Sequence, residues 1–296
     1  MNFTYCFIEN GIKASEDVDT SKISSIKAGG TARIGVYPET VAALIRSIRI
    51  CRLIDLKFKI IGGCSNTFFF DGYYDGVIIF TKYIDSVKIC DGYVSAECGC
   101  TVAKLLKTAA DSDLEVRSSL FGIPGTVGGA LRNNAGAFDG EISQVFKDGL
   151  FMDTDTLEVF RLNGNDLDFG YRRSIIAHEP LVFLNGSFYA SKRSKALIRD
   201  DFRKYAELRR TSHPSLPSLG SFFKRSGNTV PAELIDKAGL KGHRIGDAAV
   251  SDKHAGFIVN LGGATASDID LLAENIKIKI KDKYNVELQR EAELVK

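Results

Sequence analysis

Two glycine-rich segments of the chain have the residue types and spacing best suited to holding a ligand. The first, Gly62-Gly63-Cys64-Ser65-Asn66-Thr67, joins glycines to three short hydrogen-bonding side chains. Glycine lets the backbone approach a ligand closely and adopts positive φ angles without strain. Successive backbone N–H groups in such a turn form a concave anion site. The segment therefore suits a pyrophosphate, and a tight turn packed on neighbouring backbone is the equally weighted alternative.

The second segment, residues 122–137, contains five glycines in sixteen positions and is too long for a single turn. Small residues over such a length indicate backbone lying against something large and flat, such as an isoalloxazine ring and its ribityl chain. Neither segment is a GxGxxG that opens a βαβ unit or a GxxxxGK[ST] phosphate loop. The signatures of nicotinamide dehydrogenases and of P-loop kinases are therefore absent.

The cysteines and histidines are not spaced like the ligands of a metal site. Cys98-Gly-Cys100 is shorter than a CxxC pair and has no second pair downstream, and the histidines form no HExxH motif. We therefore expect no metal site, and reduced, mostly buried thiols in a cytoplasmic protein. The residues concerned are Cys6, Cys51, Cys64, Cys90, Cys98, Cys100, His178, His213, His243 and His254.

The composition is that of an ordinary globular protein. The 296 residues are 44% hydrophobic and 26% charged, and this length favours two or three domains. A net charge of +2 gives no reason to expect a nucleic-acid or membrane partner. No apolar run approaches the roughly 20 residues that span a bilayer. The first residues lack a basic region followed by an apolar core, so we expect no signal peptide.

Hydrophobic periodicity predicts the elements that would position these segments. We expect helices at residues 40–55, 101–113, 192–210, 232–240 and 266–285. We expect strands near residues 58–61, 76–80 and 93–99, and strand-like segments between residues 149 and 174. Eight basic residues in 192–210 are interpreted as a solvated helix face, and prolines predict a linker at 211–218. The order of these helices and strands, without strict βαβ alternation, favours an α+β fold over a doubly wound sheet.

Five motifs, in this order, give the chain a resemblance to a known family. They lie at residues 60–67, 122–138, 169–174, 219–225 and 234–260. With them the sequence resembles the UDP-N-acetylenolpyruvoylglucosamine reductases, flavoenzymes of bacterial cell-wall precursor synthesis, from about Ser24 to Glu291. Residues 214–225 resemble the form of the family with the more compact substrate domain.

The resemblance implies an α+β fold with two parts. One is an FAD-binding region of two α+β subdomains of the vanillyl-alcohol-oxidase (PCMH) type, expected at residues 1–190 with a subdomain boundary near 80. The other is a smaller C-terminal α+β substrate-binding domain, expected at residues 191–296. Its tail is expected to carry Glu291 back to the active site. The family also implies a monomeric cytoplasmic enzyme.

The resemblance also implies which residues form the site. Non-covalent FAD is expected at Gly62, Gly63, Ser65, Asn66, Thr67, Gly122, Ile123, Gly125, Thr126, Gly128, Gly129, Asn134, Ala135 and Gly136. Substrate binding is expected at Tyr171, Arg172 and Arg225, and catalysis at Ser221, Glu291 and Arg172. Without the resemblance, Ser221 would be interpreted as a turn residue, Arg172 as a surface ion-pair residue and Glu291 as part of a frayed terminus.

The implied reaction has two halves. NADPH passes a hydride to FAD, and N5 of the reduced flavin passes a hydride to C3 of the enolpyruvyl group of UDP-N-acetylglucosamine enolpyruvate. Ser221 gives a proton to C2, and the product is UDP-N-acetylmuramate. Negative charge develops on the substrate carboxylate, where the planar fork of Arg172 would stabilise it. Glu291 would have to be protonated or paired with a cation.

Three departures from the family pattern and two rival functions stay open. Cys64 replaces a third glycine, Ser118 replaces a glutamate, and no proline follows the basic residue Arg225. A thiol link from Cys64 to the flavin is the minor alternative to non-covalent binding. The main rival is an FAD-dependent oxidase of the same fold that acts on a sugar or alcohol. A non-catalytic protein that binds flavin or a nucleotide sugar is the second.

Overall fold

The computed structural model of the chain describes residues 3–227 and 229–296, which form two compact units. Unit 1 consists of the described residues within Met1–Glu16, Ile34–Gly63 and Gly76–Leu208, and unit 2 of those within Asp17–Arg33, Cys64–Asp75 and Arg209–Lys296. Residues 17–33 and 64–75 therefore group with the C-terminal part of the chain. The sequence-based boundaries near 80 and at 190 concern functional domains, and they stay predictions.

Four elements have residues in both units. They are β1 (Lys13–Asp19), β2 (Thr31–Tyr37), β5 (Tyr73–Phe80) and α5 (Lys195–Ser212). The three strands belong to a four-stranded sheet of order β1-β2-β5-β3, in which β3 (Phe58–Ile61) pairs in parallel with β5.

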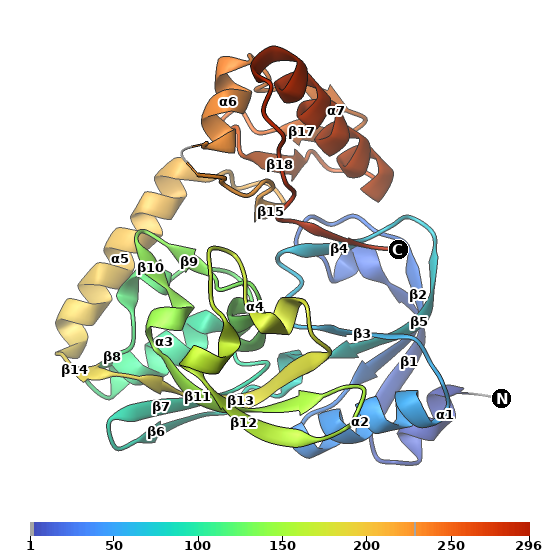
Figure 1. The fold of residues 1–296 in the computed structure, drawn as a ribbon, viewed down its shortest axis with the longest axis vertical. Helices are drawn as coiled ribbons and strands as arrows, with labels where there is room; N and C mark the ends of the chain where they lie inside the picture. The colour runs from blue at the N-terminus through green and yellow to red at the C-terminus, as the bar shows by residue number, and fades with distance from the viewer. Residues whose placement is uncertain (1–2, 228) are drawn as a thin grey trace. The chain divides into compact units, whose positions relative to one another are not determined.

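The remaining helices and strands of unit 1 can be followed by their labels in Figure 1. The helices are α1 (Phe3–Ile8), α2 (Val41–Leu53), α3 (Val102–Asp111) and α4 (Val127–Arg132). The strands are β6 (Val87–Cys90), β7 (Tyr93–Glu97), β8 (Leu114–Glu115), β9 (Gly136–Ala137), β10 (Gly140–Glu141), β11 (Phe146–Asp153), β12 (Val159–Asn163), β13 (Leu181–Tyr189) and β14 (Ser191–Lys192). Short 3₁₀ turns lie at Thr81–Tyr83, Ser118–Leu120, Ile142–Gln144, Gly164–Leu167 and Ile175–Ala177.

A five-stranded antiparallel sheet of order β12-β11-β13-β7-β6 forms the centre of unit 1. Phe146 on β11 packs against four phenylalanines with ring centroids 5.6 to 6.3 Å apart. Edge-to-face packing of this kind adds to the stabilisation that burial of the rings gives. The predicted helices at 40–55 and 101–113 are confirmed as α2 and α3, and the side chains of Thr40 and Thr101 cap them.

Unit 2 is built around a four-stranded antiparallel sheet of order β15-β18-β17-β16. Its strands are β15 (Ser218–Ser221), β16 (Arg244–Ile245), β17 (Ala248–Val250) and β18 (Phe257–Asn260), with helices α6 (Pro231–Lys237) and α7 (Ala266–Tyr284). A separate pair joins β4 (Thr67–Phe69) in parallel to β19 (Glu293–Val295), and a 3₁₀ turn lies at Thr20–Lys22. Helix α7 lies against β16 and β17 (Figure 1).

Helix α7 confirms the helix predicted at residues 266–285, and one of its faces is apolar. Ile269, Leu272, Ile276 and Ile280 are fully buried in the core of unit 2. Thr265 and Asp268 form a capping box at the first turn, and Asn285 ends the helix in the left-handed conformation. The described strands pair mainly antiparallel, with helices between them, so the α+β prediction is confirmed.

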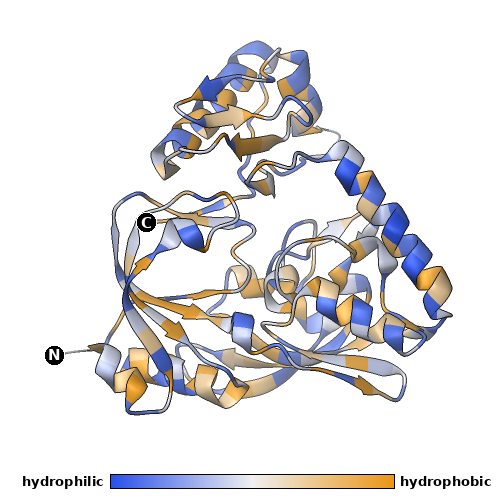
Figure 2. Ribbon diagram, turned by 180° about the vertical axis from the view of Figure 1, so that it is seen from behind, coloured by the Kyte–Doolittle hydropathy of each residue, from blue (hydrophilic) through white to orange (hydrophobic). Residues whose placement is uncertain are grey.

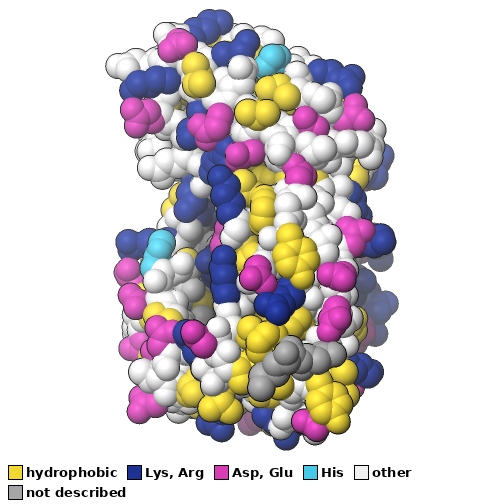
Figure 3. Space-filling view, turned by 90° about the vertical axis from the view of Figure 1, so that its right-hand side faces the viewer, with side chains coloured by type: hydrophobic (Ala, Val, Ile, Leu, Met, Phe, Trp, Pro, Cys, Tyr) yellow, Lys and Arg dark blue, Asp and Glu magenta, His cyan; other side chains and the backbone are white. Residues whose placement is uncertain are grey.

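Charged residues are spread over the surface without a dominant sign. Figure 3 shows Lys and Arg side chains beside Asp and Glu side chains on one face. Hydrophilic residues cover most of α5 in Figure 2, and only Ile198 and Phe202 of this helix are buried. Its basic residues pair with carboxylates, for example Arg199 with Asp111 at 3.0 Å. The prediction of a solvated helix face is confirmed. No helix of residues 3–227 and 229–296 is long and apolar enough to cross a membrane.

Candidate active site

The two glycine-rich segments pack against each other in unit 1. A Cβ added to Gly62 would lie 2.2 Å from Oγ1 of Thr126, and a Cβ added to Gly63 would lie 2.8 Å from Cα of Gly125. Thr126 cannot give way easily, because it is buried and its Oγ1 caps α4 by accepting from the N–H of Gly129 at 3.3 Å. Close backbone packing is therefore one reason for these glycines. This agrees with the alternative interpretation of the first segment, a tight turn packed on neighbouring backbone.

Protein carbonyl groups already occupy several N–H groups of the second segment. The N–H of Val127 donates to Cys100 (2.7 Å) and that of Gly128 donates to Cys98 (3.0 Å). Gly122 and Gly125 have φ angles of 83° and 108°, which glycine adopts without strain. The residues between β7 and α3 thus hold the segment in place, and Gly122 and Gly125 adopt conformations that side chains disfavour.

Ser119, just before the second segment, supplies a test of whether a cofactor fits. Its side chain is buried, and its Oγ has no hydrogen-bond partner among the described residues. A buried hydroxyl without a partner costs about 1–3 kcal/mol, so it calls for an acceptor or donor that the chain does not supply. The polar atoms of a flavin or its phosphates would supply one. The glycine segment and this hydroxyl together fit FAD, and sequence reasoning missed Ser119 because a serine outside any motif carries no signal.

Neighbouring groups of the protein bind the side chains of Cys64 and Ser118, two of the departures from the family pattern. Cys64 adopts a left-handed φ of 49°, the region that favours glycine, and its Sγ donates to the carbonyl of Thr67 at 3.1 Å. Burial raises the pKa of the Cys64 thiol to about 12. Ser118 donates from Oγ to Oε1 of Glu115 at 2.7 Å. The carboxylate of Glu115 therefore lies beside the position where the family has a glutamate.

Arg172 is fixed against the second segment within unit 1. Its Nη2 donates to the carbonyl of Gly136 at 3.0 Å, and its Nη1 lies 3.5 Å from the carbonyl oxygen of Asn134. Its backbone has a φ of 54°, a strained value for a residue with a side chain. The guanidinium carbon lies 5.1 Å from the ring centroid of the exposed Tyr171. Two of the three sequence-predicted substrate residues, Tyr171 and Arg172, thus lie beside the second cofactor segment.

Asn134 holds the turn that carries these groups. Its Nδ2 donates to Oε2 of Glu141 (2.9 Å) and to the carbonyl of Gly170 (3.0 Å). Its Oδ1 accepts from the N–H of Ser143 at 3.2 Å. The buried side chain therefore connects the second segment to the loop before Arg172, which gives Asn134 a structural role besides the predicted contact with FAD.

Ser221 and Glu291 are brought together in unit 2. Ser221 ends β15 and is exposed. The next residue, Phe222, accepts at its carbonyl from the N–H of Glu291 at 2.9 Å. The N–H of Lys224 donates to the carbonyl of Gln289 at 2.8 Å, so residues 289–291 run antiparallel to residues 222–224. The C-terminal tail is therefore ordered, and Glu291 is not part of a frayed end.

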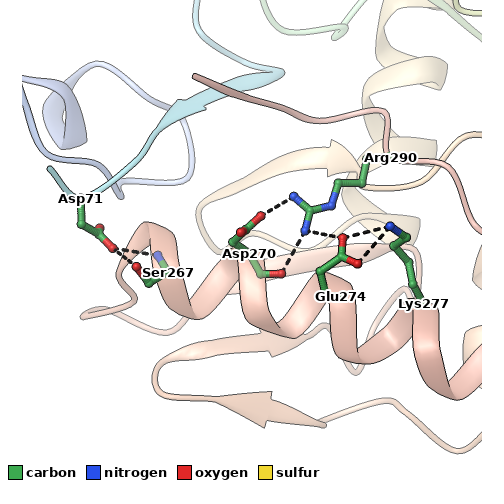
Figure 4. A network of polar contacts seen from close by, with 6 residues as sticks. All are labelled: Asp71, Ser267, Asp270, Glu274, Lys277 and Arg290. Atoms are coloured by element: carbon green, nitrogen blue, oxygen red, sulfur yellow. Dashed lines mark hydrogen bonds and ion pairs between the residues drawn. The ribbon is translucent and has the colours of Figure 1, made fainter. Parts of the chain in front are cut away.

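Arg290 anchors the same tail to helix α7, as Figure 4 shows. Its Nη1 binds Oδ1 of Asp270, and its Nη2 lies 3.0 Å from the carbonyl oxygen of Asp270 and 2.9 Å from Oε1 of Glu274. The Nζ of Lys277 lies 3.0 Å from both carboxylate oxygens of Glu274. At the start of the helix, Asp71 accepts from Ser267 (Figure 4).

The first glycine segment contributes its later residues to unit 2. Asn66 donates from Nδ2 to the carbonyl of Glu291 at 2.9 Å, and its own carbonyl accepts from the N–H of Glu293 at 2.9 Å. Ser25 connects Cys64 to β15, because its N–H donates to Cys64 (3.1 Å) and its Oγ donates to the carbonyl of Ser218 (2.6 Å).

The predicted site residues thus fall into two sets. Unit 1 holds Gly62, Gly63, Gly122, Ile123, Gly125, Thr126, Gly128, Gly129, Asn134, Ala135, Gly136, Tyr171 and Arg172. Unit 2 holds Ser65, Asn66, Thr67, Ser221, Arg225 and Glu291. The peptide bond between Gly63 and Cys64 joins the two sets within one loop.

Four of the six cysteines, Cys51, Cys64, Cys98 and Cys100, are buried, and all six are free thiols. The expectation of mostly buried thiols is therefore confirmed. Among the described residues, no group of three or more His, Cys, Asp or Glu side chains could hold a metal ion.

Comparison with known proteins matches both parts of the chain to family models. Residues 32–152 match an FAD binding domain, and residues 212–295 match the C-terminal domain of UDP-N-acetylenolpyruvoylglucosamine reductase. A reductase of that name from Caldicellulosiruptor saccharolyticus is 38% identical over 288 residues, which cover 96% of this chain and 92% of the relative. One from Clostridium novyi is 38% identical over 273 residues, or 92% and 89% of the two chains.

Solved structures show the same likeness. The crystal structure of UDP-N-acetylenolpyruvylglucosamine reductase from Thermus caldophilus matches with a TM-score of 0.80 and 26% identity, over 96% of this chain and 99% of the other. Berberine bridge enzyme from Eschscholzia californica matches with a TM-score of 0.51 and 14% identity over 66% of this chain and 44% of the other, a likeness of fold alone. The predicted fold, a PCMH-type FAD-binding region followed by a smaller C-terminal domain, is confirmed.

Proposed function

The chain belongs to the UDP-N-acetylenolpyruvoylglucosamine reductase family, and from that premise we propose how its own residues divide the work. It is an FAD-dependent oxidoreductase that uses NADPH to reduce the enolpyruvyl group of UDP-N-acetylglucosamine enolpyruvate in peptidoglycan synthesis. Bound FAD supplies the hydride chemistry between NADPH and the enolpyruvyl double bond. The remaining roles belong to side chains of the protein.

The pairing of Ser221 with the tail that carries Glu291 is the observation that supports these roles best. Both lie within residues 212–295, which match the C-terminal domain of the family, and the Phe222–Glu291 hydrogen bond makes them neighbours along two paired segments. We assign proton donation to C2 of the substrate to Ser221. A hydroxyl can serve here because a carbanion-like carbon is far more basic than a carboxylate, and loss of a positioned proton donor typically slows a reaction by about 10²–10⁴.

Arg172 binds the substrate carboxylate in this proposal and stabilises the charge that develops on it. Its guanidinium is held by the carbonyls of Asn134 and Gly136, so it is in place before the substrate arrives. A preorganised cation of this kind stabilises a transition state without reorganising during the reaction. Tyr171 and Arg225 are exposed and complete the contacts to the UDP-sugar.

Glu291 assists the protonation step from beside Ser221. A carboxylate there would repel the developing negative charge unless it were protonated or paired with a cation. The residues that would hold FAD are the two glycine-rich segments with Ser65, Asn66 and Thr67. We assign residues 1–190 to FAD binding and 191–296 to substrate binding, in a monomeric cytoplasmic enzyme.

Replacement of Ser221 and Glu291 tests these roles. S221A and E291Q should each lower the rate at which the enolpyruvyl compound oxidises the reduced enzyme, by about 10² or more for S221A. The rate of reduction by NADPH should change little, because neither side chain has a role in that half. S218A on the same strand and E293Q on the same tail are matched controls. Unchanged turnover in both S221A and E291Q would contradict the roles of Ser221 and Glu291 in protonation.

A further inference from the structure

We propose that Asn66 is a positioning residue for Glu291, in addition to its place in the cofactor loop. This inference rests on the proposed role of Glu291 in protonation. The side-chain amide of Asn66 is directed at the protein, where Nδ2 donates to the carbonyl of Glu291 at 2.9 Å. If the side chain of Asn66 served only to bind the cofactor, this hydrogen bond to the protein would not be needed.

Two hydrogen bonds from one residue hold the tail on both sides of Ala292. The side chain of Asn66 binds Glu291, and its carbonyl accepts from the N–H of Glu293 at 2.9 Å. The parallel pairing of β19 with β4 starts at Thr67 and Glu293, directly after these bonds. Asn66 therefore sets where the backbone of Glu291 lies relative to the loop.

The opposite side of the tail is held by the strand end that carries Ser221. The N–H of Glu291 donates to Phe222, so both backbone polar groups of Glu291 have fixed partners. The first partner, Phe222, directly follows the proposed proton donor Ser221. The second, Asn66, belongs to the loop expected to bind the pyrophosphate. The backbone from which the Glu291 carboxylate extends is thereby fixed between these two segments.

Arg290 gives a third, independent anchor to helix α7. Because of this anchor and the β19–β4 pairing, loss of the Asn66 amide should not unfold the tail. It should release the carbonyl of Glu291 and make local opening of residues 289–293 easier. Misplacement of a catalytic group by about 1 Å can cost on the order of 10²-fold in rate.

Hydrogen exchange and half-reaction kinetics test this inference. In N66A without FAD, backbone amides of residues 289–293 should exchange at least about tenfold faster than in the wild type. In the FAD-loaded N66A protein, oxidation by the enolpyruvyl compound should slow about tenfold or more, with reduction by NADPH nearly unchanged. N66D has the same shape but cannot donate to a carbonyl, so it should behave like N66A.

The matched control is N275A. Asn275 follows Glu274 on α7, but its side chain is engaged elsewhere in unit 2, because its Oδ1 accepts a hydrogen bond of 2.8 Å from Nε2 of His243. N275A should leave exchange at residues 289–293 and both half-reactions as in the wild type.

A double mutant separates positioning of Glu291 from a plain cofactor role. If Asn66 acts through Glu291, N66A should slow the E291Q protein much less than it slows the wild type. An equal slowing in both backgrounds would overturn the inference. So would an N66A protein that binds FAD more weakly but has normal half-reactions at saturating FAD and normal exchange in the tail.

Failure of the underlying function would look different. If E291Q oxidised with the enolpyruvyl compound as fast as the wild type, the proposed role of Glu291 would fall, and with it the positioning role. If the wild type itself did not react with that compound, the proposed function would fall first.

Discussion

Gly62 and Thr126 lie so close that a Cβ on Gly62 would sit 2.2 Å from Oγ1 of Thr126. Because Thr126 is buried and caps α4, G62A must push the two glycine-rich segments apart. Overpacking of this kind costs about 1–3 kcal/mol. We expect G62A to lower the free energy of unfolding of the FAD-free protein by that amount, as measured by denaturant titration.

Gly129 offers the matched comparison. A Cβ there would meet nothing closer than 3.5 Å, and the residue lies inside helix α4, where alanine is favoured over glycine by about 0.5–1 kcal/mol. G129A should therefore be at least as stable as the wild type and should bind FAD more weakly if the backbone of Gly129 approaches the cofactor. Equal FAD affinity in G129A would remove Gly129 from the cofactor site.

Neighbouring buried serines make a second pair of variants. The Oγ of Ser118 is bound to Glu115, whereas that of Ser119 has no partner among the described residues. S118A should lose about 1 kcal/mol of stability and keep its FAD affinity. S119A should be at least as stable as the wild type without FAD, because it removes an unpartnered buried hydroxyl, and should bind FAD about 2- to 10-fold more weakly, as measured by flavin fluorescence. The reverse outcome would show that the Ser119 hydroxyl does not face the cofactor.

Cys64 is expected to leave FAD non-covalently bound. A thiol whose pKa is raised to about 12 by burial, and which donates to the carbonyl of Thr67, is a poor nucleophile. Acid precipitation of the FAD-loaded protein should leave all of the yellow colour in the supernatant. Flavin that stays in the pellet of the wild type and not of C64A would establish the covalent link.

His213 should make unit 2 less stable in acid. Burial is the main reason that its pKa is lowered to about 4, and the charges of Arg209, His254 and Lys253 add to the shift. The unfolded chain, with a His pKa of about 6.5, then binds more protons than the folded one as pH falls. The stability is complete above about pH 6.5 and is lost progressively between about pH 6.5 and 4.

The variant H213F removes this titration. The drop in melting temperature of the FAD-free protein between pH 7.5 and pH 5 should be smaller in H213F than in the wild type. H178Q changes an exposed histidine and serves as the control, with a pH dependence like that of the wild type. If H213F loses as much stability in acid as the wild type, the burial of His213 is not a source of the acid sensitivity.

Local patterns were enough to predict much of the fold. Hydrophobic periodicity predicted α2 and α3, which Thr40 and Thr101 cap, and the helix at residues 266–285, whose Ile269, Leu272, Ile276 and Ile280 are buried in α7. These features depend on residues within one or two helical turns. The glycine segments were found for the same reason, since glycine marks positions where backbone comes close to something else.

Contacts between residues far apart in the sequence had no such signal. The bond from Ser25 to Ser218 spans 193 positions and that from Asn66 to Glu291 spans 225, so no local pattern announces them. The grouping of residues 17–33 and 64–75 with the C-terminal unit follows from such bonds. The left-handed conformations of Cys64 and Arg172 were also missed, because only glycine and asparagine usually indicate positive φ in a sequence.

The most direct test of the central claim is an anaerobic visible spectrum of the FAD-loaded protein during two additions. NADPH should bleach the flavin bands, and UDP-N-acetylglucosamine enolpyruvate should restore them with formation of UDP-N-acetylmuramate. Bands that return only when oxygen is admitted would contradict the reductase assignment and indicate an oxidase. A protein that takes up no FAD would contradict the interpretation of both glycine-rich segments.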